Sequence, residues 1–429
     1  MRCSYQLPLV GILLFLLIPS QLCKICEVSK EDLHLNLLLN TMINSKYTSE
    51  TQPANVLLSL RLIGIHDQTQ TQRLVQRVKN NVERKDSNLS SGQLAVIILA
   101  LGACHSPDEI FTYDKHLLSH LENKFQGELE NMKAHDGNPL TNFYQLGLDV
   151  LALCLFNGSY SATEVAEFFN HYKKNYYFGG QFSVDTGAMA VLALTCVNRS
   201  LTNEQIKADK NLKKIDELIS FLVEKIMSEK KENGLIGNTF STGVAMQALF
   251  VSSNYYNESE WDCQQTLDTI LQEISQGVFN NPTAAAQILP PLMGRTYLDV
   301  EDCPYVSGLD TFNISNHVPE SERSNSSSLI MVYYSVVINE TYSINVTVPN
   351  GSVFLDVMKA AQKKNETTFG FTMEQSSWGP YITSVQGLYA NNNKRTYWEL
   401  LSDGKALSQG VGSYVVHEEE NLEIRWSTY

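Results

Sequence analysis

The sequence predicts a mainly α-helical protein: a ring of six helical hairpins (an α/α toroid, or α6/α6 barrel) followed by a small α+β domain. Apolar segments rich in Ala and Leu recur roughly 40 to 55 residues apart in the N-terminal two-thirds, which is the spacing of a helical hairpin. Periodicity is lost between residues 304 and 328, and from residue 329 apolar residues alternate with period two, as in strands. A chain of 429 residues is also long enough for two domains.

The recurring segments are apolar almost all round, so each is expected to be an inner helix buried among other helices. In the clearest one, FSVDTGAMAVLALTC, the side chains of Ser183, Asp185 and Thr186 can cap the helix start. More amphipathic outer helices, such as 69–82 and 213–229, are expected to alternate with the inner ones. Six hairpins then close into a ring whose inner helices all point in one direction. The inner segments are 54–65, 91–104, 143–154, 182–196, 241–250 and 282–292.

Polar side chains stand at the starts of these inner helices and would therefore share one mouth of the ring. Taken singly, each is better explained as a helix cap or as a locally bonded amide. Taken together, neutral amides and hydroxyls with one carboxylate suit the binding of an amide-rich ligand better than catalysis. The residues are Gln93, Thr141, Asn142, Tyr144, Gln145, Asp185, Asn238, Ser241 and Gln287.

An enzyme is the alternative, because helical toroids also carry glycosidases. Glycoside hydrolysis needs two carboxylates across a cleft, whereas Asp185 is the one acidic residue of the mouth and Asp149 lies inside an apolar helix. Serine-hydrolase and zinc-protease motifs are missing from the sequence. His116 and His120 are spaced by four residues but lack an acidic partner, so no metal site is expected. The sequence therefore predicts a binding protein and not an enzyme.

The N-terminus resembles a secretory signal peptide, with Arg2 before an apolar run, 7–18, that is too short to span a bilayer. We expect the signal peptide to be 1–23, because cleavage after Cys23 leaves six cysteines, whereas cleavage after Ser20 would leave seven. The net charge of −14 argues against nucleic acid and anionic membranes as partners. The protein is therefore expected to be secreted and extracellular, without membrane insertion.

An oxidising compartment favours full pairing of the remaining cysteines. Cys154 and Cys196 each stand at the end of a predicted inner helix, so they would lie on the same rim of the ring, and we expect them to pair. Ten N-x-S/T sequons indicate a heavily glycosylated surface. They are Asn88, Asn157, Asn198, Asn257, Asn313, Asn325, Asn339, Asn345, Asn350 and Asn365.

The C-terminal third is organised differently from the ring, for which we take 24–303. Residues 304–328 are rich in Ser, Asn, Pro and charge and are predicted to be a flexible linker. The small α+β domain follows at 329–429, with several strands and one short helix. Trp378 stands in a Gly/Pro turn and is expected to be an exposed contact, whereas Trp398 is better explained as a core residue.

Several long motifs, in one order over the whole chain, resemble the vertebrate cobalamin-binding proteins, the family of haptocorrin, intrinsic factor and transcobalamin, and within it the haptocorrin branch most. The resemblance implies a secreted carrier that holds cobalamin (vitamin B12) or another corrinoid between its two domains without catalysis. A monomer, and uptake through a glycan-dependent receptor, would fit such a carrier. The motifs are SSGQLA, LTNFYQLGLDVLALC, FSVDTGAMAVLALTC, GLIGNTFSTG, AAAQILP, SWGPYIT and YWELL.

The resemblance also implies ligand contacts and disulfides. In the ring the contacts fall on the mouth residues named above, with Phe143 added. The implied disulfides are Cys26–Cys263, Cys104–Cys303 and Cys154–Cys196, the last of which agrees with the pairing expected from the helix ends. In the small domain the contacts fall on Ser377, Trp378, Gly379, Pro380, Tyr381, Trp398, Glu399, Leu400 and Leu401.

The chain departs from the family pattern in two places. The transcobalamin branch has a cobalt-coordinating His just before its SVDT segment, where this chain has Gly180, Gln181 and Phe182. We therefore expect no protein ligand to cobalt. The haptocorrin pattern has two cysteines in the small domain at the positions of Ser384 and Tyr389, so we expect that domain to lack one disulfide.

Overall fold

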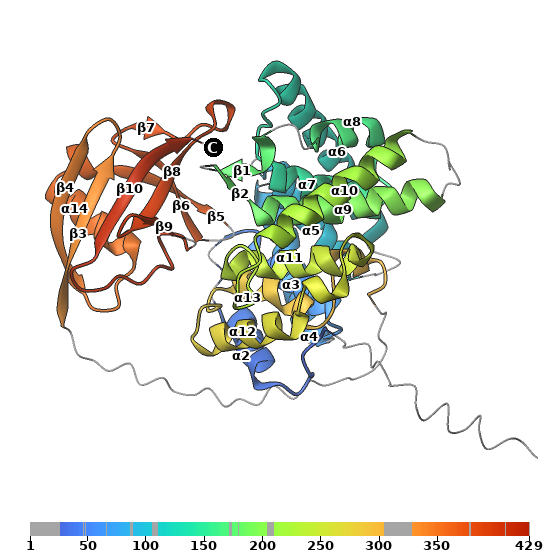
Figure 1. The fold of residues 1–429 in the computed structure, drawn as a ribbon, viewed down its shortest axis with the longest axis horizontal. Helices are drawn as coiled ribbons and strands as arrows, with labels where there is room; N and C mark the ends of the chain where they lie inside the picture. Colours follow the sequence, from blue (N-terminus) through green and yellow to red (C-terminus); the bar gives the residue numbers. More distant parts are fainter. Residues whose placement is uncertain are drawn as a thin grey trace, which may run out of the picture.

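The chain forms a larger helical part and a smaller part of strands, which lie side by side (Figure 1). The predicted signal peptide and nearly all of the predicted linker lie outside the described residues. No described helix is both long enough and apolar enough to cross a membrane. The computed structural model describes residues 26–45, 47, 49–65, 67–85, 89–104, 110–170, 174–178, 180–203, 210–303, 328–376, 379–407 and 409–428.

Six inner helices form the wall of the ring, close to the segments that the sequence predicted. Each packs against the next along the chain, and the last packs back against the first, so the ring is closed. They are buried along nearly their whole length because they present no polar face. They are α3 (Gln52–Leu62), α5 (Ser91–Gly102), α7 (Phe143–Leu155), α9 (Val184–Asn203), α11 (Thr239–Val251) and α13 (Pro282–Leu292).

An outer helix precedes each inner helix, which confirms the predicted toroid of hairpins in the described part of the chain. In α10, Ile215, Leu218 and Leu222 are buried on one side, while lysines and glutamates cover the other. The outer helices are α2 (Leu33–Asn44), α4 (Gln68–Lys85), α6 (Ile110–Ala134), α8 (Ala162–Phe168), α10 (Lys210–Ser228) and α12 (Cys263–Ser275).

Short elements fill the connections of the ring. The strands β1 (Tyr177–Phe178) and β2 (Gln181–Phe182) form a small hairpin before α9. After α13, the 3-10 helix η5 packs against α3, α5 and α9. The 3-10 helices are η2 (Lys174–Tyr176), η3 (Ser253–Tyr255), η4 (Glu258–Glu260) and η5 (Tyr297–Val300).

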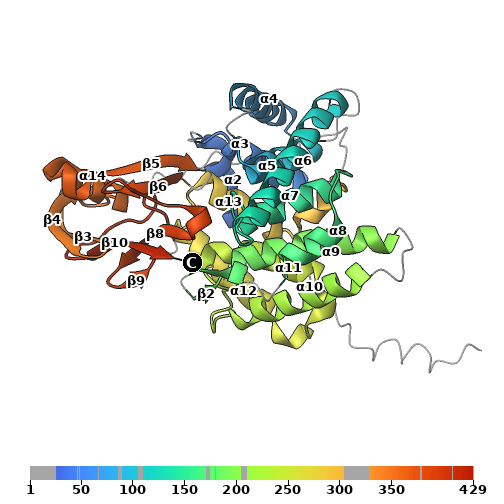
Figure 2. The same cartoon turned by 90° about the horizontal axis from the view of Figure 1, so that it is seen from above.

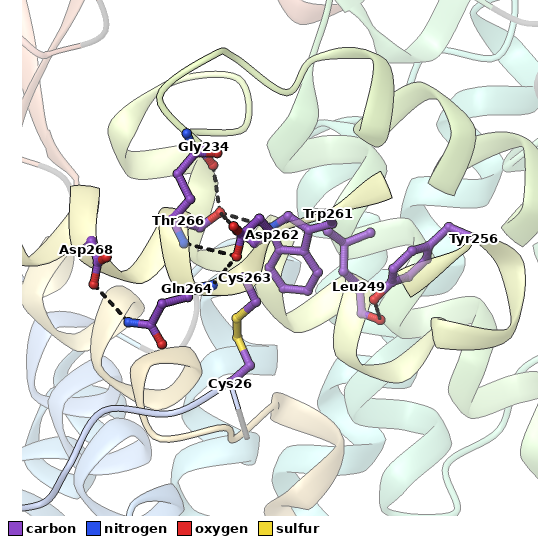
Figure 3. The surroundings of a disulfide bond; sticks show 11 residues. Cys26, Gly234, Leu249, Tyr256, Trp261, Asp262, Cys263, Gln264, Thr266 and Asp268 are labelled. Carbon is purple, nitrogen blue, oxygen red and sulfur yellow. Dashed lines mark hydrogen bonds between the residues drawn. A yellow bond between two sulfur atoms is a disulfide. The ribbon is translucent and has the colours of Figure 1, made fainter. Parts of the chain in front are cut away.

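A disulfide fixes the first described residue of the chain to the last hairpin. Cys26 is bonded to Cys263 at the start of α12 (Figure 3). The same corner is held by Thr266, whose Oγ1 donates to Gly234 O at 2.8 Å and accepts from Trp261 Nε1 at 2.9 Å (Figure 3). The N-terminal segment is therefore attached where the ring closes.

The pairing of Cys154 with Cys196 is present, with 6.2 Å between the Cα atoms. Its predicted position needs one correction, because α9 continues beyond Cys196 to Asn203, packed against α10. The third implied bridge, between Cys104 and Cys303, is not among the disulfides of the described residues. It remains a prediction.

The small part contains two sheets. The larger has the strand order β4-β3-β10-β8-β9, with β10 parallel to β3 and antiparallel to β8, and is therefore a mixed sheet. Its core lies under α14 (Phe354–Lys364), where Phe354 and Met358 pack with Val332 and Val346. The strands are β3 (Leu329–Val337), β4 (Thr341–Pro349), β8 (Thr396–Ser402), β9 (Lys405–Ala406) and β10 (Asn421–Thr428).

The second sheet has three strands in the order β5-β6-β7 and is approached by the short helix α15 (Glu366–Phe369). Ser384 and Tyr389 are direct cross-strand partners between β6 and β7. The two positions at which the family pattern has cysteines are therefore adjacent here, and Ser384 Oγ lies 2.7 Å from Thr372 Oγ1 instead. The strands are β5 (Phe371–Ser376), β6 (Gly379–Val385) and β7 (Leu388–Tyr389).

Candidate functional site

A cleft of about 370 Å³ lies between the mouth of the ring and the small part. Helix starts and loops of the ring form one side, and the start of β6 together with a loop after β9 forms the other. Both parts of the chain therefore contribute to one site. The lining residues are Tyr144, Asp185, Asn238, Phe240, Val278, Asn280, Asn281, Ala284, Gln287, Pro380, Tyr381, Gln409, Gly410 and Ser413.

Side-chain caps fix the starts of the inner helices at this mouth. Asn142 Oδ1 accepts from the Gln145 N–H at 2.9 Å, and Asn281 Oδ1 accepts from the Thr283 N–H at 2.8 Å. Asn238 Oδ1 accepts from two backbone N–H groups of α11. These asparagines satisfy N–H groups that a helix start leaves without partners. The capping interpretation is thus correct for Asn142 and Asn238, and Asn281 is a further cap that was not predicted; Asn238 and Asn281 also line the cleft.

Asp185 brings the one carboxylate of the predicted mouth into the cleft. It lies in the first turn of α9, and its Oδ2 accepts from Ser241 Oγ on α11 at 2.5 Å. Burial raises the pKa of Asp185, and the hydrogen bond from Ser241 opposes that shift. The side chain is half-buried and lines the cleft. It therefore presents an oriented acceptor to whatever the cleft holds.

Tyr144 forms part of the same wall. Burial, with smaller contributions from Tyr297 and Asp185, raises the pKa of Tyr144 well above its ordinary value. Its phenol is consequently neutral at physiological pH and can both donate and accept a hydrogen bond. The backbone N–H of Tyr297 donates to the buried Gln247 Oε1 at 2.9 Å, which fixes the position of Tyr297.

Gln287 is the most informative residue of the site. It lies on α13, its side chain is only 6% exposed, and it lines the cleft. Its Oε1 is buried and has no hydrogen-bond partner in the described part of the chain. Because a buried acceptor without a partner costs free energy, this amide indicates an N–H donor on a ligand.

Other predicted mouth residues serve the helix starts and do not line this cleft. Gln93 Oε1 accepts from the Ser90 N–H at 2.9 Å, and Gln145 Oε1 accepts from Ser90 Oγ at 2.6 Å. Gly92 makes room for Gln145, since a Cβ there would lie 2.7 Å from its side chain. The Thr141 N–H donates to the buried Glu128 Oε2 at 3.0 Å, and Phe143 is buried.

In the small part, Pro380 and Tyr381 line the cleft, and Tyr381 is 48% exposed. The ligand contacts implied for both residues stay a prediction. Gly379 precedes them with a φ of 105°, which favours glycine. Ser377 and Trp378 lie outside the described residues, so their predicted contacts stay untested.

Trp398 is a core residue, which agrees with the interpretation that the sequence favoured. Its indole is 6% exposed, donates to Leu388 O at 3.2 Å, and lies 5.0 Å from the Trp426 ring. Trp398, Glu399, Leu400 and Leu401 are not among the lining residues of the cleft, so the ligand contacts implied for them remain a prediction.

Several residues that line the cleft were not predicted from the sequence. Asn281 could have been found as a cap, because it precedes Pro282 at the start of an inner helix. Gln409, Gly410 and Ser413 carried no signal, since the loop that holds them has no periodic pattern. Phe240, Val278, Asn280 and Ala284 were likewise not predicted.

Two hydrogen bonds also connect the ring directly to the small part. Asn131 Nδ2 donates to Asn393 Oδ1 at 2.9 Å, and Asn138 Nδ2 donates to Asn393 O at 3.2 Å. These bonds link the end of α6 and the loop after it to η6 (Asn392–Lys394) of the small part. Among the described residues, no group of three or more His, Cys, Asp or Glu side chains could hold a metal ion.

A family model described as "Eukaryotic cobalamin-binding protein" matches residues 8–326, well over half of the chain. The chain belongs to the eukaryotic cobalamin-binding proteins. A second model, described as a domain of unknown function, matches residues 351–428 of this cobalamin-binding protein. The membership agrees with the resemblance that the sequence motifs implied.

Relatives of this cobalamin-binding protein match along almost their whole length. Human Transcobalamin-1 is 65% identical, over 100% of this chain and 100% of the relative. Transcobalamin-1 of Sus scrofa is 50% identical, over 93% of this chain and 94% of the relative. Human cobalamin binding intrinsic factor is 32% identical, over 91% of each chain.

A solved structure described as haptocorrin in complex with Cbi superposes with a TM-score of 0.86 and 63% identity, covering 95% of this chain and all of that one. The similarity to haptocorrin confirms both the fold class and the branch that the motifs favoured. The relatives are cobalamin-binding carriers, and the alternative of a glycosidase using Asp185 finds no support.

Proposed function

We propose that this protein is a secreted carrier that binds cobalamin and related corrinoids in the cleft between its two parts and releases them chemically unchanged. The observation that carries the proposal is the buried Gln287 Oε1 without a partner, in a cleft lined from both sides. The acetamide and propionamide side chains of a corrin offer the N–H donors that this acceptor lacks. Membership of the family and the likeness to the haptocorrin–Cbi complex support the same ligand class.

Each wall has its own role in this proposal. Gln287, Asp185 and Asn238 hold polar groups of the ligand from the ring, and Tyr144 can serve as donor or acceptor. Pro380 and Tyr381 cover the ligand from the small part. A good buried hydrogen bond contributes about 1 kcal/mol net, so affinity comes from the set and from enclosure by both parts.

The test uses the full-length secreted protein mixed with cyanocobalamin and passed through gel filtration. We expect corrin absorption to elute with the protein at one ligand per chain, and the recovered ligand to be unaltered. Tyr381→Ser should weaken retention. Tyr389→Ser is the matched control, because Tyr389 is also an exposed tyrosine of the three-stranded sheet but does not line the cleft. A chemically altered ligand would contradict the carrier proposal.

We further propose that no protein imidazole coordinates the cobalt. Where the transcobalamin branch has its histidine, this chain has Gly180, Gln181 and Phe182, none of which is a histidine. Aquo- and cyano-cobalamin complexes are compared by absorption from neutral pH to about pH 3, below ordinary carboxyl pKa values. We expect both complexes to persist without a histidine-ligated spectrum. Such a spectrum, lost on replacing His171, would contradict this part of the proposal.

We infer in addition that the carrier is monomeric and that a receptor recognising its glycans takes it up. We also infer that the helical domain ends at residue 303 and the small domain begins at residue 329, with a linker of 304–328 between them. Light scattering on the purified complex measures the first of these. A dimer at low micromolar concentration would contradict the inference of a monomer.

A further inference from the structure

The larger sheet of the small part has two edges of very different character. One edge is β9, which has two residues and offers little to pair with. The other is β4, with nine residues paired to β3 on one side only within the described residues. An edge strand directs half of its N–H and C=O groups away from the sheet, where another strand can bind them. The exposed edge of this sheet is therefore β4.

The β4 strand itself contains none of the charged side chains that usually protect an edge, and one lysine reaches it from α14. Its sequence, TYSINVTVP, contains no charged residue and is rich in β-branched residues, which favours pairing with a further strand. Val346 and Val348 face the core, while Asn345 and Thr347 are exposed on the other face. One backbone group is already occupied, since Lys364 Nζ donates to Asn345 O at 2.8 Å. Pro349 protects only the last position.

Three sequons follow this edge from its beginning to its end. Asn339 lies in the turn before β4, Asn345 in the middle of the strand, and Asn350 directly after it. All three side chains are exposed. At about 3.3 Å per strand residue, they stand roughly 15 to 20 Å apart. The spacing places one sequon at the middle of the edge and one just beyond each end.

We propose that N-linked oligosaccharides on Asn339, Asn345 and Asn350 block the β4 edge against pairing with another strand, above all β4 of a second copy. This inference rests on the proposed secretion, because the sugar is added on the secretory route. There the asparagine amide nitrogen attacks the anomeric carbon of an oligosaccharyl-diphospholipid. The new C–N bond replaces the C–O bond to the diphosphate, and the nitrogen loses one proton.

The position of the edge fits this role. A neighbouring strand must lie about 4.8 Å from β4. The Asn345 side chain stands on the exposed face of the sheet, and a bulky oligosaccharide there would crowd the side chains of a strand placed beside β4. In both views β4 lies on the side of the small part that faces away from the ring (Figure 1 and Figure 2). The sugars would therefore protect the sheet without covering the cleft.

The experiment compares full-length variants secreted from a cell line that glycosylates proteins. Asn345→Gln removes the central sequon and keeps the edge neutral, and we expect the fraction larger than a monomer, measured by gel filtration with light scattering, to rise severalfold. Asn345→Lys removes the same sequon but places a charge on the edge, and should remain monomeric. Thr347→Ser keeps the sequon and should match the wild type.

Ser259→Ala is the control for loss of one sugar elsewhere, because it removes the Asn257 sequon on the ring. It should stay monomeric. Where Asn345→Gln is poorly secreted, folded wild-type protein trimmed enzymatically to one sugar per site should associate in its place. The inference is overturned if Asn345→Gln or the trimmed protein stays monomeric, or if Asn345→Lys or Ser259→Ala associates equally. It is also overturned if peptide mass spectrometry finds Asn345 unmodified while other sequons carry sugar. That outcome would leave the proposed binding of cobalamin untouched.

Discussion

At the scale of single residues, Gln287 combines a structural cost with a function. Its Oε1 has no hydrogen-bond partner among the described residues, so Gln287→Leu should leave the free energy of unfolding unchanged or raise it by about 1 kcal/mol. The same change should weaken cobalamin binding about tenfold, which corresponds to one lost hydrogen bond. Denaturant unfolding and ligand dissociation measure the two effects. Gln272→Leu on the exposed side of α12 is the control, and a loss of stability without loss of affinity would contradict the prediction.

Asp149 is a second buried polar residue on an inner helix, and its consequence is a pH dependence. Its carboxyl oxygens are buried and have no hydrogen-bond partner among the described residues, because the neighbouring Ser91 Oγ donates to Glu128 at 3.0 Å. Burial raises the pKa of Asp149 well above its ordinary value. The polar hydroxyl of Ser91 opposes this shift, and the negative charge of Glu128 adds to it. The folded protein therefore binds this proton more tightly than the unfolded chain does.

We accordingly expect Asp149→Asn to gain stability relative to the wild type as the pH rises. The difference should grow from about pH 4, the pKa in the unfolded chain, up to the raised pKa in the folded protein, and stay constant above it. Its full size should be about 1 to 3 kcal/mol. Thermal unfolding of both proteins between pH 4 and pH 9 measures it. A difference that does not vary with pH would contradict the assignment.

At the scale of elements, the end of α5 and the segment after η5 should be joined by Cys104 and Cys303. Arg61 connects their surroundings, since its Nε donates to Ala103 O at 2.9 Å and its charge lowers the pKa of Cys303. Burial outweighs that effect and raises the pKa of the reduced Cys303 thiol to about 11. A reduced thiol here would react slowly with reagents unless the protein is unfolded.

Alkylation under denaturing, non-reducing conditions followed by peptide mass mapping tests this bridge. We expect a Cys104–Cys303 peptide pair and no alkylated cysteine. The double variant Cys104→Ser/Cys303→Ser should lose up to about 5 kcal/mol in the chain-entropy account of a loop of about 200 residues. Alkylation of both Cys104 and Cys303 in this denaturing, non-reducing assay of the secreted protein would show that the bridge is absent.

The inner helices were predictable because segments without a polar face have one stable environment, among other helices. Ser90, Asn142 and Asn238 could likewise be recognised as caps from residue type and position. The cleft wall from the small part was not predictable in the same way. A linker of 304–328 could reach about 80 Å when extended, so sequence alone does not determine which loop faces the ring. Gln409 and Ser413 were missed for this reason.

At the scale of the whole molecule, Asn393 couples the small part to the ring through Asn131 and Asn138. Asn393→Ala removes the hydrogen bond from Asn131 to the Asn393 side chain, worth about 1 kcal/mol net, and keeps the bond from Asn138 to the Asn393 backbone carbonyl. Cobalamin should then dissociate several times faster, while the thermal midpoint of the ligand-free protein changes little. Stopped-flow exchange against free ligand measures the rate, and Gln76→Ala, which removes an exposed hydrogen bond to Asn80 within α4, is the control. Equal rates for the two variants would contradict a coupling role.

The attachment of Cys26 to Cys263 has a mechanical meaning for the ring. Open arrays of helical repeats unfold from their ends, where a terminal repeat has only one neighbour. Here the first hairpin packs on the last through α2, α12 and α13, and the disulfide crosses that seam. The chain around the ring is thus a continuous hoop without a terminal repeat. Fraying or a protease must open it by breaking into the wall, at a helix that two neighbours already hold.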